Sequence, residues 1–206
     1  MLNIGLTGGI GSGKSTVDRL FREKGAYIVD FDMLAHEAEA PGSTAWKEII
    51  AHFGKKILNE DGTINRERLG TIVFRDRKQL EKLNAIVHPS LFNEWKRTIE
   101  AIHLQKEDTI IISDIPLLIE VGWHEYVDFV ILVYISPEEQ IKRIMNRNGY
   151  SRHDAMDRLN SQMPIDEKVP YAHFIINNEG PVEETRKIVD NVWLQLLEQE
   201  KRSTKH

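Results

Sequence analysis

The chain has 206 residues, of which 41% are hydrophobic and 29% are charged, with a net charge of −5 and no cysteine. This length suits one α/β domain with an insertion or two, and the slight negative charge argues against a broad nucleic-acid-binding surface. The lack of cysteine excludes disulfides and thiolate metal sites, and without a signal peptide or an apolar run of roughly 20 residues we expect a cytoplasmic protein that does not enter a membrane.

Short apolar runs along the chain predict the strands of one sheet. The runs "TIIISD" and "DFVILVYI" are almost continuously apolar or β-branched, which is typical of strands that are covered on both faces. We therefore predict an α/β fold with a five-stranded parallel sheet between helices. The predicted strands are 3–7, 27–30, 109–114, 129–135 and 174–177.

A glycine-rich stretch, "GLTGGIGSGKST", joins the first predicted strand to a predicted helix over 15–24. Residues 8–15 match G-x-x-x-x-G-K-[ST], the phosphate-binding P-loop, in its required strand and helix context. Such a loop wraps a polyphosphate with its backbone N–H groups, and side chains would block that approach. Lys14 can reach the β- and γ-phosphates of a nucleotide, and the Ser15 hydroxyl can bind Mg²⁺.

Nearly all of the long connection between the second and third strands has helical spacing. Ser43 predicts the cap of a helix that runs through Phe53 and stops at Gly54. "RERLGTIVF" and "RKQLEKLNAIV" have helical spacing too, and we predict that another helix begins after Pro89. We interpret this segment as a helical insertion that carries a substrate site.

Acidic side chains stand at two predicted strand ends, where open α/β sheets bind ligands. Asp30 and Asp32 lie two apart, so along an extended chain they point the same way, and Asp32 could accept a proton from an acceptor hydroxyl. The alternative for Asp32 is an exposed loop acid or a helix cap. Asp114 ends a buried strand, where it could hold Mg²⁺ directly or through water, or act as a cap. His88 is a substrate candidate through its place in the insertion, and Leu117 could form a wall of the site.

Basic residues are concentrated in a second insertion, over 137–171. Arg143 and Arg147 are four apart and so share one helix face. Beside a nucleotide site they suggest a lid whose arginines offset the charge of the transferring phosphoryl group; the alternative is a solvated helix face. Ser151 with Asp154 predicts a capping box for a second helix, and 181–197 predicts a C-terminal amphipathic helix.

Taken in order, these motifs resemble one family, dephospho-CoA kinase. The resemblance covers nearly the whole chain and rests on "LTGGIGSGKST", "VDFD", "LNAIVHP", "DIPLLIE", "KRIMNR", "SRHDAMDRLNSQM" and "FIINNEG". It implies a P-loop kinase fold and the last step of coenzyme A synthesis, in which ATP phosphorylates the ribose 3′-hydroxyl of dephospho-CoA. It also implies a core of 1–32, 108–136 and 172–206, a CoA-binding insertion of 33–107 and a lid of 137–171.

The resemblance further implies roles for single residues. Asp32 would face the 3′-hydroxyl as base or positioner, although Phe31 stands where a small residue is expected. His88 would line the acceptor site, Lys14, Arg143 and Arg147 would act on the phosphates, and Asn177 would lie by the adenine. The position of Asp114 alone supports it as a magnesium ligand. The loop residues that would hold ATP are Thr7, Gly8, Gly9, Gly11, Ser12, Gly13, Lys14, Ser15 and Thr16.

Two other functions share the phosphate loop. A nucleoside or nucleoside monophosphate kinase would have the loop and lid, but the large helical insertion fits it less well. A non-enzymatic nucleotide switch of the GTPase kind would need a guanine-reading N-K-x-D sequence, and "FIINNEG" does not supply its acidic partner. We expect a monomer, with a small homo-oligomer as the alternative, and we expect ATP and Mg²⁺ as cofactors.

Overall fold

The computed structural model describes residues 1–73, 75–106 and 109–203. The chain divides into two compact units. The first is formed by Met1–Asp30 with Gln105–His206, and the second by Phe31–Leu104. The predicted insertion, 33–107, begins two residues after the start of the second unit and extends three residues past its end, and its predicted end at 107 lies outside the described residues.

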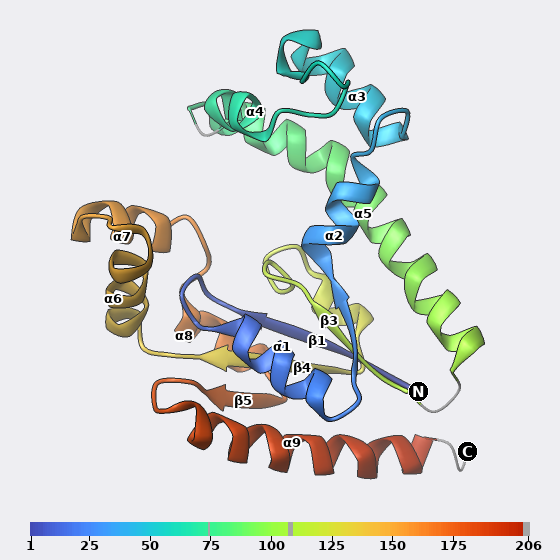
Figure 1. Cartoon of the computed structure of the whole chain (residues 1–206), viewed down its shortest axis with the longest axis vertical. Coiled ribbons are helices and arrows are strands. Elements are labelled where there is room, and N and C mark those ends of the chain that lie inside the picture. Colours follow the sequence, from blue (N-terminus) through green and yellow to red (C-terminus); the bar gives the residue numbers. More distant parts are fainter. Residues whose placement is uncertain (74, 107–108, 204–206) are drawn as a thin grey trace. The chain divides into compact units, whose positions relative to one another are not determined.

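The first unit is built on a five-stranded, all-parallel sheet with the order β2-β3-β1-β4-β5 (Figure 1). This confirms the predicted sheet, since each strand lies within one residue of its predicted bounds. The nearly continuous apolar runs are buried because both faces of the central strands are covered. The strands are β1 (Leu2–Gly8), β2 (Tyr27–Asp30), β3 (Ile110–Asp114), β4 (Phe129–Tyr134) and β5 (Phe174–Asn177).

Two long helices of the first unit pack on one face of this sheet, α1 (Lys14–Glu23) and α9 (Val182–Ser203) (Figure 1). Val17, Leu20 and Phe21 of α1 are buried in the same cluster as the α9 side chains and the sheet. The predicted end of α9 at 197 is wrong, because the helix continues to Ser203. The extra turn is made of strong helix formers such as Glu, Gln and Lys, which keep a polar helix end formed.

The remaining helices of the first unit lie between β3 and β5 in the sequence. The elements are the 3₁₀ turn Trp123–Tyr126, α6 (Pro137–Asn148), α7 (Arg152–Leu159), α8 (Ile165–Lys168) and the 3₁₀ turn Val169–Tyr171. Gly149 ends α6 in the left-handed conformation, at φ 69°, and the Ser151 Oγ accepts the backbone N–H of Asp154 at the start of α7. Ile144 and Ala155 form a small core between these two helices.

The second unit is helical and has its own core. Ser43 Oγ accepts the backbone N–H of Trp46, so Ser43 caps its helix as predicted, and Gly54 follows the last turn. Ile49, Ile57 and Ile86 are among the buried residues of the core. The elements are α2 (Phe31–Ala38), α3 (Thr44–Phe53), the 3₁₀ turn Lys55–Ile57, α4 (Arg66–Val73) and α5 (Arg77–Gln105).

Two predictions for the second unit are wrong. Pro89 does not separate two helices, because α5 is one helix with Pro89 inside it. Proline removes one helical hydrogen bond, but Ile86 and Trp95 are buried on either side of it and hold both halves in one helix. Asp32 does not continue an extended strand, since β2 ends at Asp30 and Asp32 lies in the first turn of α2. Burial of Phe31 and Leu34 on one helix face explains the change of periodicity.

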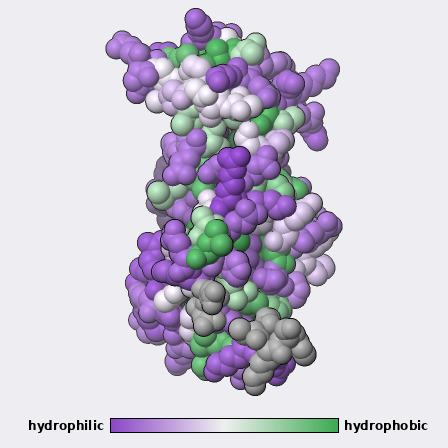
Figure 2. Space-filling model, turned by 90° about the vertical axis from the view of Figure 1, so that its right-hand side faces the viewer, coloured by the Kyte–Doolittle hydropathy of each residue, from purple (hydrophilic) through white to green (hydrophobic). Residues whose placement is uncertain are grey.

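The surface agrees with the high content of charged residues. The face drawn in Figure 2 is mostly hydrophilic, with separate small hydrophobic areas. Among the described residues, no helix combines the length and the apolar character needed to cross a membrane.

Candidate active site

The phosphate loop joins β1 to α1 in the first unit. Gly11 and Gly13 adopt left-handed backbone conformations, with φ of 79° and 82°, which glycine reaches without steric cost. The loop therefore turns sharply into α1, and the exposed Ser15 lies in the first turn of that helix. A helix N-terminus with unpaired N–H groups favours bound anions, so this arrangement suits a polyphosphate.

Lys14 and Asp114 form an ion pair beside the loop. The Lys14 ammonium donates a hydrogen bond to the Asp114 carboxylate, and both side chains are largely but not fully buried, with 18% and 16% exposed. Asp114 is the last residue of β3 and lies in register with Leu6 of β1. An ammonium has three donors, so Lys14 can keep Asp114 and still bind a phosphate oxygen.

Asp18 is a buried acid of this site that we did not predict. It lies one turn after Lys14 on α1, so both face the same side of the helix. Burial, then the charge of Asp114 and a hydrogen bond with it, together raise the pKa of Asp18 to about 8, against the opposing effect of Lys14. Asp18 is thus mostly protonated at neutral pH. The spacing from Lys14 was the one signal in the sequence that could have revealed it.

We predict that Asp18→Asn flattens the pH dependence of stability. The pKa of Asp18 is about 8 in the folded chain, against an ordinary 3.8. Between these values the folded chain binds more protons than the unfolded chain, so the free energy of unfolding falls as pH rises from about 4 to about 8. Asparagine does not titrate. The free energy of unfolding of the variant, minus that of the wild type, should therefore be larger at pH 8 than at pH 5, by on the order of a few kcal/mol at most.

Urea unfolding at pH 5, 6.5 and 8, without nucleotide or Mg²⁺, measures this effect. The control is Asp157→Asn, at an exposed position of α7, which should follow the wild-type curve. A fall in stability for Asp18→Asn as steep as that of the wild type would contradict the shifted pKa.

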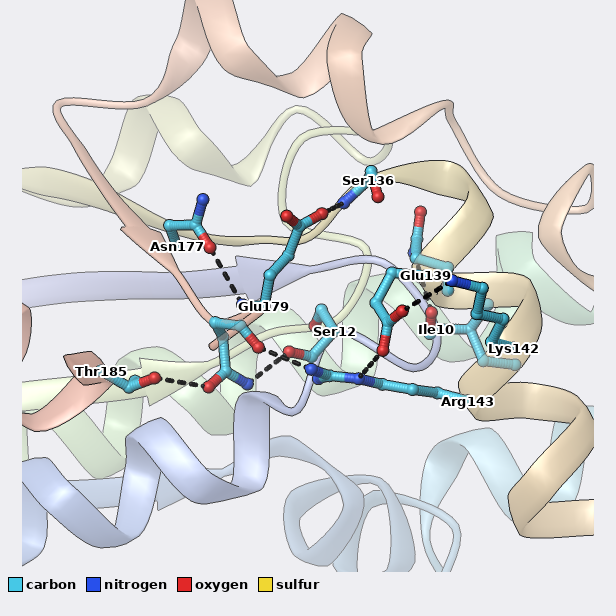
Figure 3. Close-up of polar contacts among 11 residues, drawn as sticks. Ile10, Ser12, Ser136, Glu139, Lys142, Arg143, Asn177, Glu179 and Thr185 are labelled. Atoms are coloured by element: carbon cyan, nitrogen blue, oxygen red, sulfur yellow. Dashed lines mark hydrogen bonds and ion pairs between the residues drawn. The ribbon is translucent and has the colours of Figure 1, made fainter. Parts of the chain in front are cut away.

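The two predicted lid arginines differ in their contacts on α6. Arg143 Nη2 donates to the backbone carbonyl of Asn178 at 2.7 Å and Arg143 Nε donates to Glu139 at 3.2 Å (Figure 3). Arg143 is therefore held close to the phosphate loop before a ligand binds. Arg147 is exposed, and its Nε donates to the side chain of Asn148 at 3.1 Å.

Asn177 is the last residue of β5 and Asn178 follows it, and the two asparagines have different surroundings. Asn177 is exposed, and its side-chain oxygen accepts the backbone N–H of Glu179 at 2.9 Å (Figure 3). Asn178, which the sequence analysis did not select, is buried and donates from Nδ2 to the Ser12 carbonyl at 2.7 Å. The structure therefore brings Asn178, rather than the side chain of Asn177, into contact with the phosphate loop.

Thr7 of β1 contacts the segment that follows β3, and Leu117 belongs to that segment. The Thr7 hydroxyl is buried and donates to the Pro116 carbonyl at 3.1 Å, so the protein itself uses this hydroxyl. Leu117 is 37% exposed, while Leu118 is fully buried. Of the two leucines, only Leu117 presents a surface that a ligand can reach.

Asp32 and His88 belong to the second unit. Asp32 is exposed in the first turn of α2. His88 is half-buried in α5, and burial lowers its pKa below the ordinary value, so its imidazole is neutral at neutral pH. Neutral imidazole can accept as well as donate a hydrogen bond.

The residues near the loop suit a magnesium ion that arrives with a nucleotide. No group of three or more His, Cys, Asp or Glu side chains that could hold a metal occurs among the described residues. Mg²⁺ in phosphate-transferring sites is commonly held by one or two protein ligands together with substrate phosphates and water. The Ser15 hydroxyl and the Asp114 carboxylate are oxygen groups of the kind that Mg²⁺ prefers, at the start of α1 and the end of β3.

A parallel sheet of this order, with a phosphate loop after its central strand and an arginine-bearing helix beside that loop, defines a P-loop kinase. The family model described as dephospho-CoA kinase matches residues 2–184. The chain belongs to the dephospho-CoA kinase family, which confirms the predicted family, fold class and activity: it is an ATP-using kinase of the final step of coenzyme A synthesis.

Known proteins support this membership. The dephospho-CoA kinase of Syntrophus aciditrophicus is 53% identical over 201 residues, which cover 98% of this chain and 86% of that protein. The structure of dephospho-CoA kinase from Campylobacter jejuni matches with a TM-score of 0.73 at 29% identity, over 96% of this chain and 98% of that one. Shikimate kinase from Acinetobacter baumannii, at 16% identity and a TM-score of 0.51, covers 97% of this chain and 94% of its own, and shares the fold.

Proposed function

We propose that the chain transfers the γ-phosphoryl group of ATP to the ribose 3′-hydroxyl of dephospho-CoA, forming coenzyme A and ADP. The acceptor oxygen forms a bond to the γ-phosphorus, the bond from that phosphorus to the oxygen shared with the β-phosphate breaks, and the hydroxyl proton leaves. The observation that carries the proposal is the complete phosphate loop with its Lys14–Asp114 pair, in a chain of this family.

On the ATP side, the loop and the basic side chains have complementary tasks. We assign the phosphates to the backbone N–H groups of 8–16 and to the Lys14 ammonium, and the adenine to the surroundings of Asn177. Arg143 and Arg147 offset the charge that spreads over the γ-phosphate oxygens. In a loose transition state for phosphoryl transfer, positioning and charge stabilisation supply most of the catalysis.

Ser15 and Asp114 are the residues we assign to Mg²⁺. When bound, the ion neutralises charge on the β- and γ-phosphates. The Asp114 carboxylate is already fixed by Lys14, so this ligand does not need to be ordered when the nucleotide arrives.

On the acceptor side, we assign the insertion 33–107 to the binding of dephospho-CoA. Asp32 orients the 3′-hydroxyl and accepts its proton, while His88 and Leu117 line the acceptor site. The segment 137–171 serves as a lid that excludes water, which would otherwise hydrolyse ATP. A cytoplasmic location and a monomeric state stay predictions.

An acceptor panel tests the proposal. ADP formation is measured with dephospho-CoA, with adenosine and AMP, and with a 3′-deoxy analogue of dephospho-CoA. We expect turnover with dephospho-CoA alone, and a product with one phosphate on the 3′-oxygen. Faster turnover with adenosine or AMP would favour the nucleoside kinase alternative, and ADP release that is independent of any acceptor would favour the nucleotide switch.

A further inference from the structure

The backbone carbonyl groups of a phosphate loop need hydrogen-bond donors. If its N–H groups turn toward the ligand, its carbonyl groups turn away from it and need donors elsewhere in the protein. Two side-chain amides supply them. Gln140 Nε2 donates to the Ile10 carbonyl at 2.8 Å, and Asn178 Nδ2 donates to the Ser12 carbonyl at 2.7 Å. Both amides are far from the loop in sequence, on α6 and directly after β5.

Both side chains are buried. Gln140 is fully buried in the first turn of α6, where its backbone N–H donates to the Ser136 carbonyl at 3.0 Å, and its side-chain oxygen has no hydrogen-bond partner among the described residues. Asn178 is 6% exposed, and its side-chain oxygen accepts the hydroxyl of the buried Thr185 at 2.8 Å (Figure 3). Because the Thr185 hydroxyl donates to that oxygen, the amide nitrogen of Asn178 is turned toward the loop.

The same two amides account for two of the loop glycines. A Cβ atom on Gly9 would lie 2.2 Å from Gln140 Nε2, and a Cβ atom on Gly13 would lie 2.2 Å from Asn178 Nδ2. Gly13 also has a positive φ, whereas the backbone of Gly9 suits any residue. At Gly9 a side chain would therefore displace the Gln140 amide, although the backbone conformation does not require glycine.

We infer that Gln140 and Asn178 form an amide clasp, a pair of positioning residues that preset the phosphate loop for ATP. The clasp touches neither the acceptor nor the transferred phosphate. It acts by removing alternative loop conformations before ATP binds, which raises ATP affinity. The inference rests on the ATP site of the proposed function and is independent of the identity of the acceptor.

Acid substitutions test the clasp. Gln140→Glu and Asn178→Asp keep the shape of each side chain but replace the donating nitrogen with an acceptor. We expect each to weaken the binding of MgATP about tenfold or more, because a buried carbonyl loses its donor. The KM for dephospho-CoA should stay within about twofold of the wild type. The matched controls are Gln195→Glu and Asn191→Asp at exposed positions of α9, which should bind MgATP as the wild type does.

The affinity is measured by calorimetry with MgATP and no acceptor, so the result does not depend on which acceptor the enzyme uses. Thermal unfolding shows which variants are folded. Thr185→Val, which removes only the hydroxyl that orients Asn178, replaces Asn178→Asp if that variant does not fold. Wild-type MgATP affinity in the folded variants would overturn the inference.

A double substitution distinguishes positioning from general damage. Gly9→Ala should weaken MgATP binding about tenfold in the wild type, since the new methyl group displaces the Gln140 amide. In a Gln140→Ala background that amide is gone, and the next atom near the new Cβ is Ile165 Cδ1 at 3.4 Å, an ordinary contact. The added effect of Gly9→Ala there should be less than about twofold. An equal loss in both backgrounds would mean that Gly9 serves the nucleotide directly and would overturn the clasp.

Discussion

Lys14→Ala is expected to abolish phosphate transfer while the chain stays folded. The ammonium of Lys14 is the one loop side chain that pairs with Asp114, and its charge is assigned to the β- and γ-phosphates. Loss of a preorganised charge contact at a phosphoryl group costs about 10²- to 10³-fold or more in rate. The Lys14–Asp114 pair is largely buried, with 18% and 16% of its side chains exposed, so its loss should lower the free energy of unfolding measurably while the chain stays folded.

Single-turnover transfer and thermal unfolding, measured on the same preparation, test this result. Lys24→Ala is the matched control, since Lys24 follows the same helix and pairs with Asp190. This variant should transfer phosphate at the wild-type rate. Normal turnover by folded Lys14→Ala would show that the loop does not act as a kinase phosphate clamp.

Asp32→Asn is expected to bind ATP normally and to transfer phosphate to dephospho-CoA about 10²- to 10⁴-fold more slowly, the range of general acid–base help. Asparagine keeps the shape of the side chain and still accepts a hydrogen bond, but it does not take the proton. Asp32 is assigned as the proton acceptor because it lies two residues beyond the end of β2 and belongs to the sequence "VDFD", which resembles that of the family. Asp32 is exposed in the first turn of α2.

Asp30→Asn is the comparison variant for Asp32→Asn. Asp30 is the last residue of β2 and lies in register with Asp114 of β3, and its charge contributes to the raised pKa of the buried Asp18. We expect Asp30→Asn to change stability more than it changes the rate of transfer. If Asp32→Asn reacted at the wild-type rate and Asp30→Asn were inactive, the proton acceptor would be Asp30, at the edge of the sheet.

Local patterns in the sequence determined most of the secondary structure and the centre of the ATP site. The strands could be predicted because residues buried on both faces form continuous apolar runs, and the helix over 44–53 because Ser43 and Gly54 mark its ends. The phosphate loop was visible because its chemistry depends on consecutive residues, from Gly8 to Ser15. Local patterns failed at Pro89 and Asp32, where burial of neighbouring apolar side chains overrode the usual stop signal and the extended periodicity.

Only the tertiary structure decided which distant side chains meet at the loop. The pairing of β1 with β3 brings Asp114 to Lys14 and Asp18, and the pairing of β4 with β5 brings Asn178 to the Ser12 carbonyl. These contacts depend on strand order and register, which are set by the packing of the whole sheet and leave no periodic trace in the sequence. A buried amide such as Gln140 occupies one position on a helix, and its partner is a backbone carbonyl, which every residue possesses. The residue types therefore do not reveal the contact.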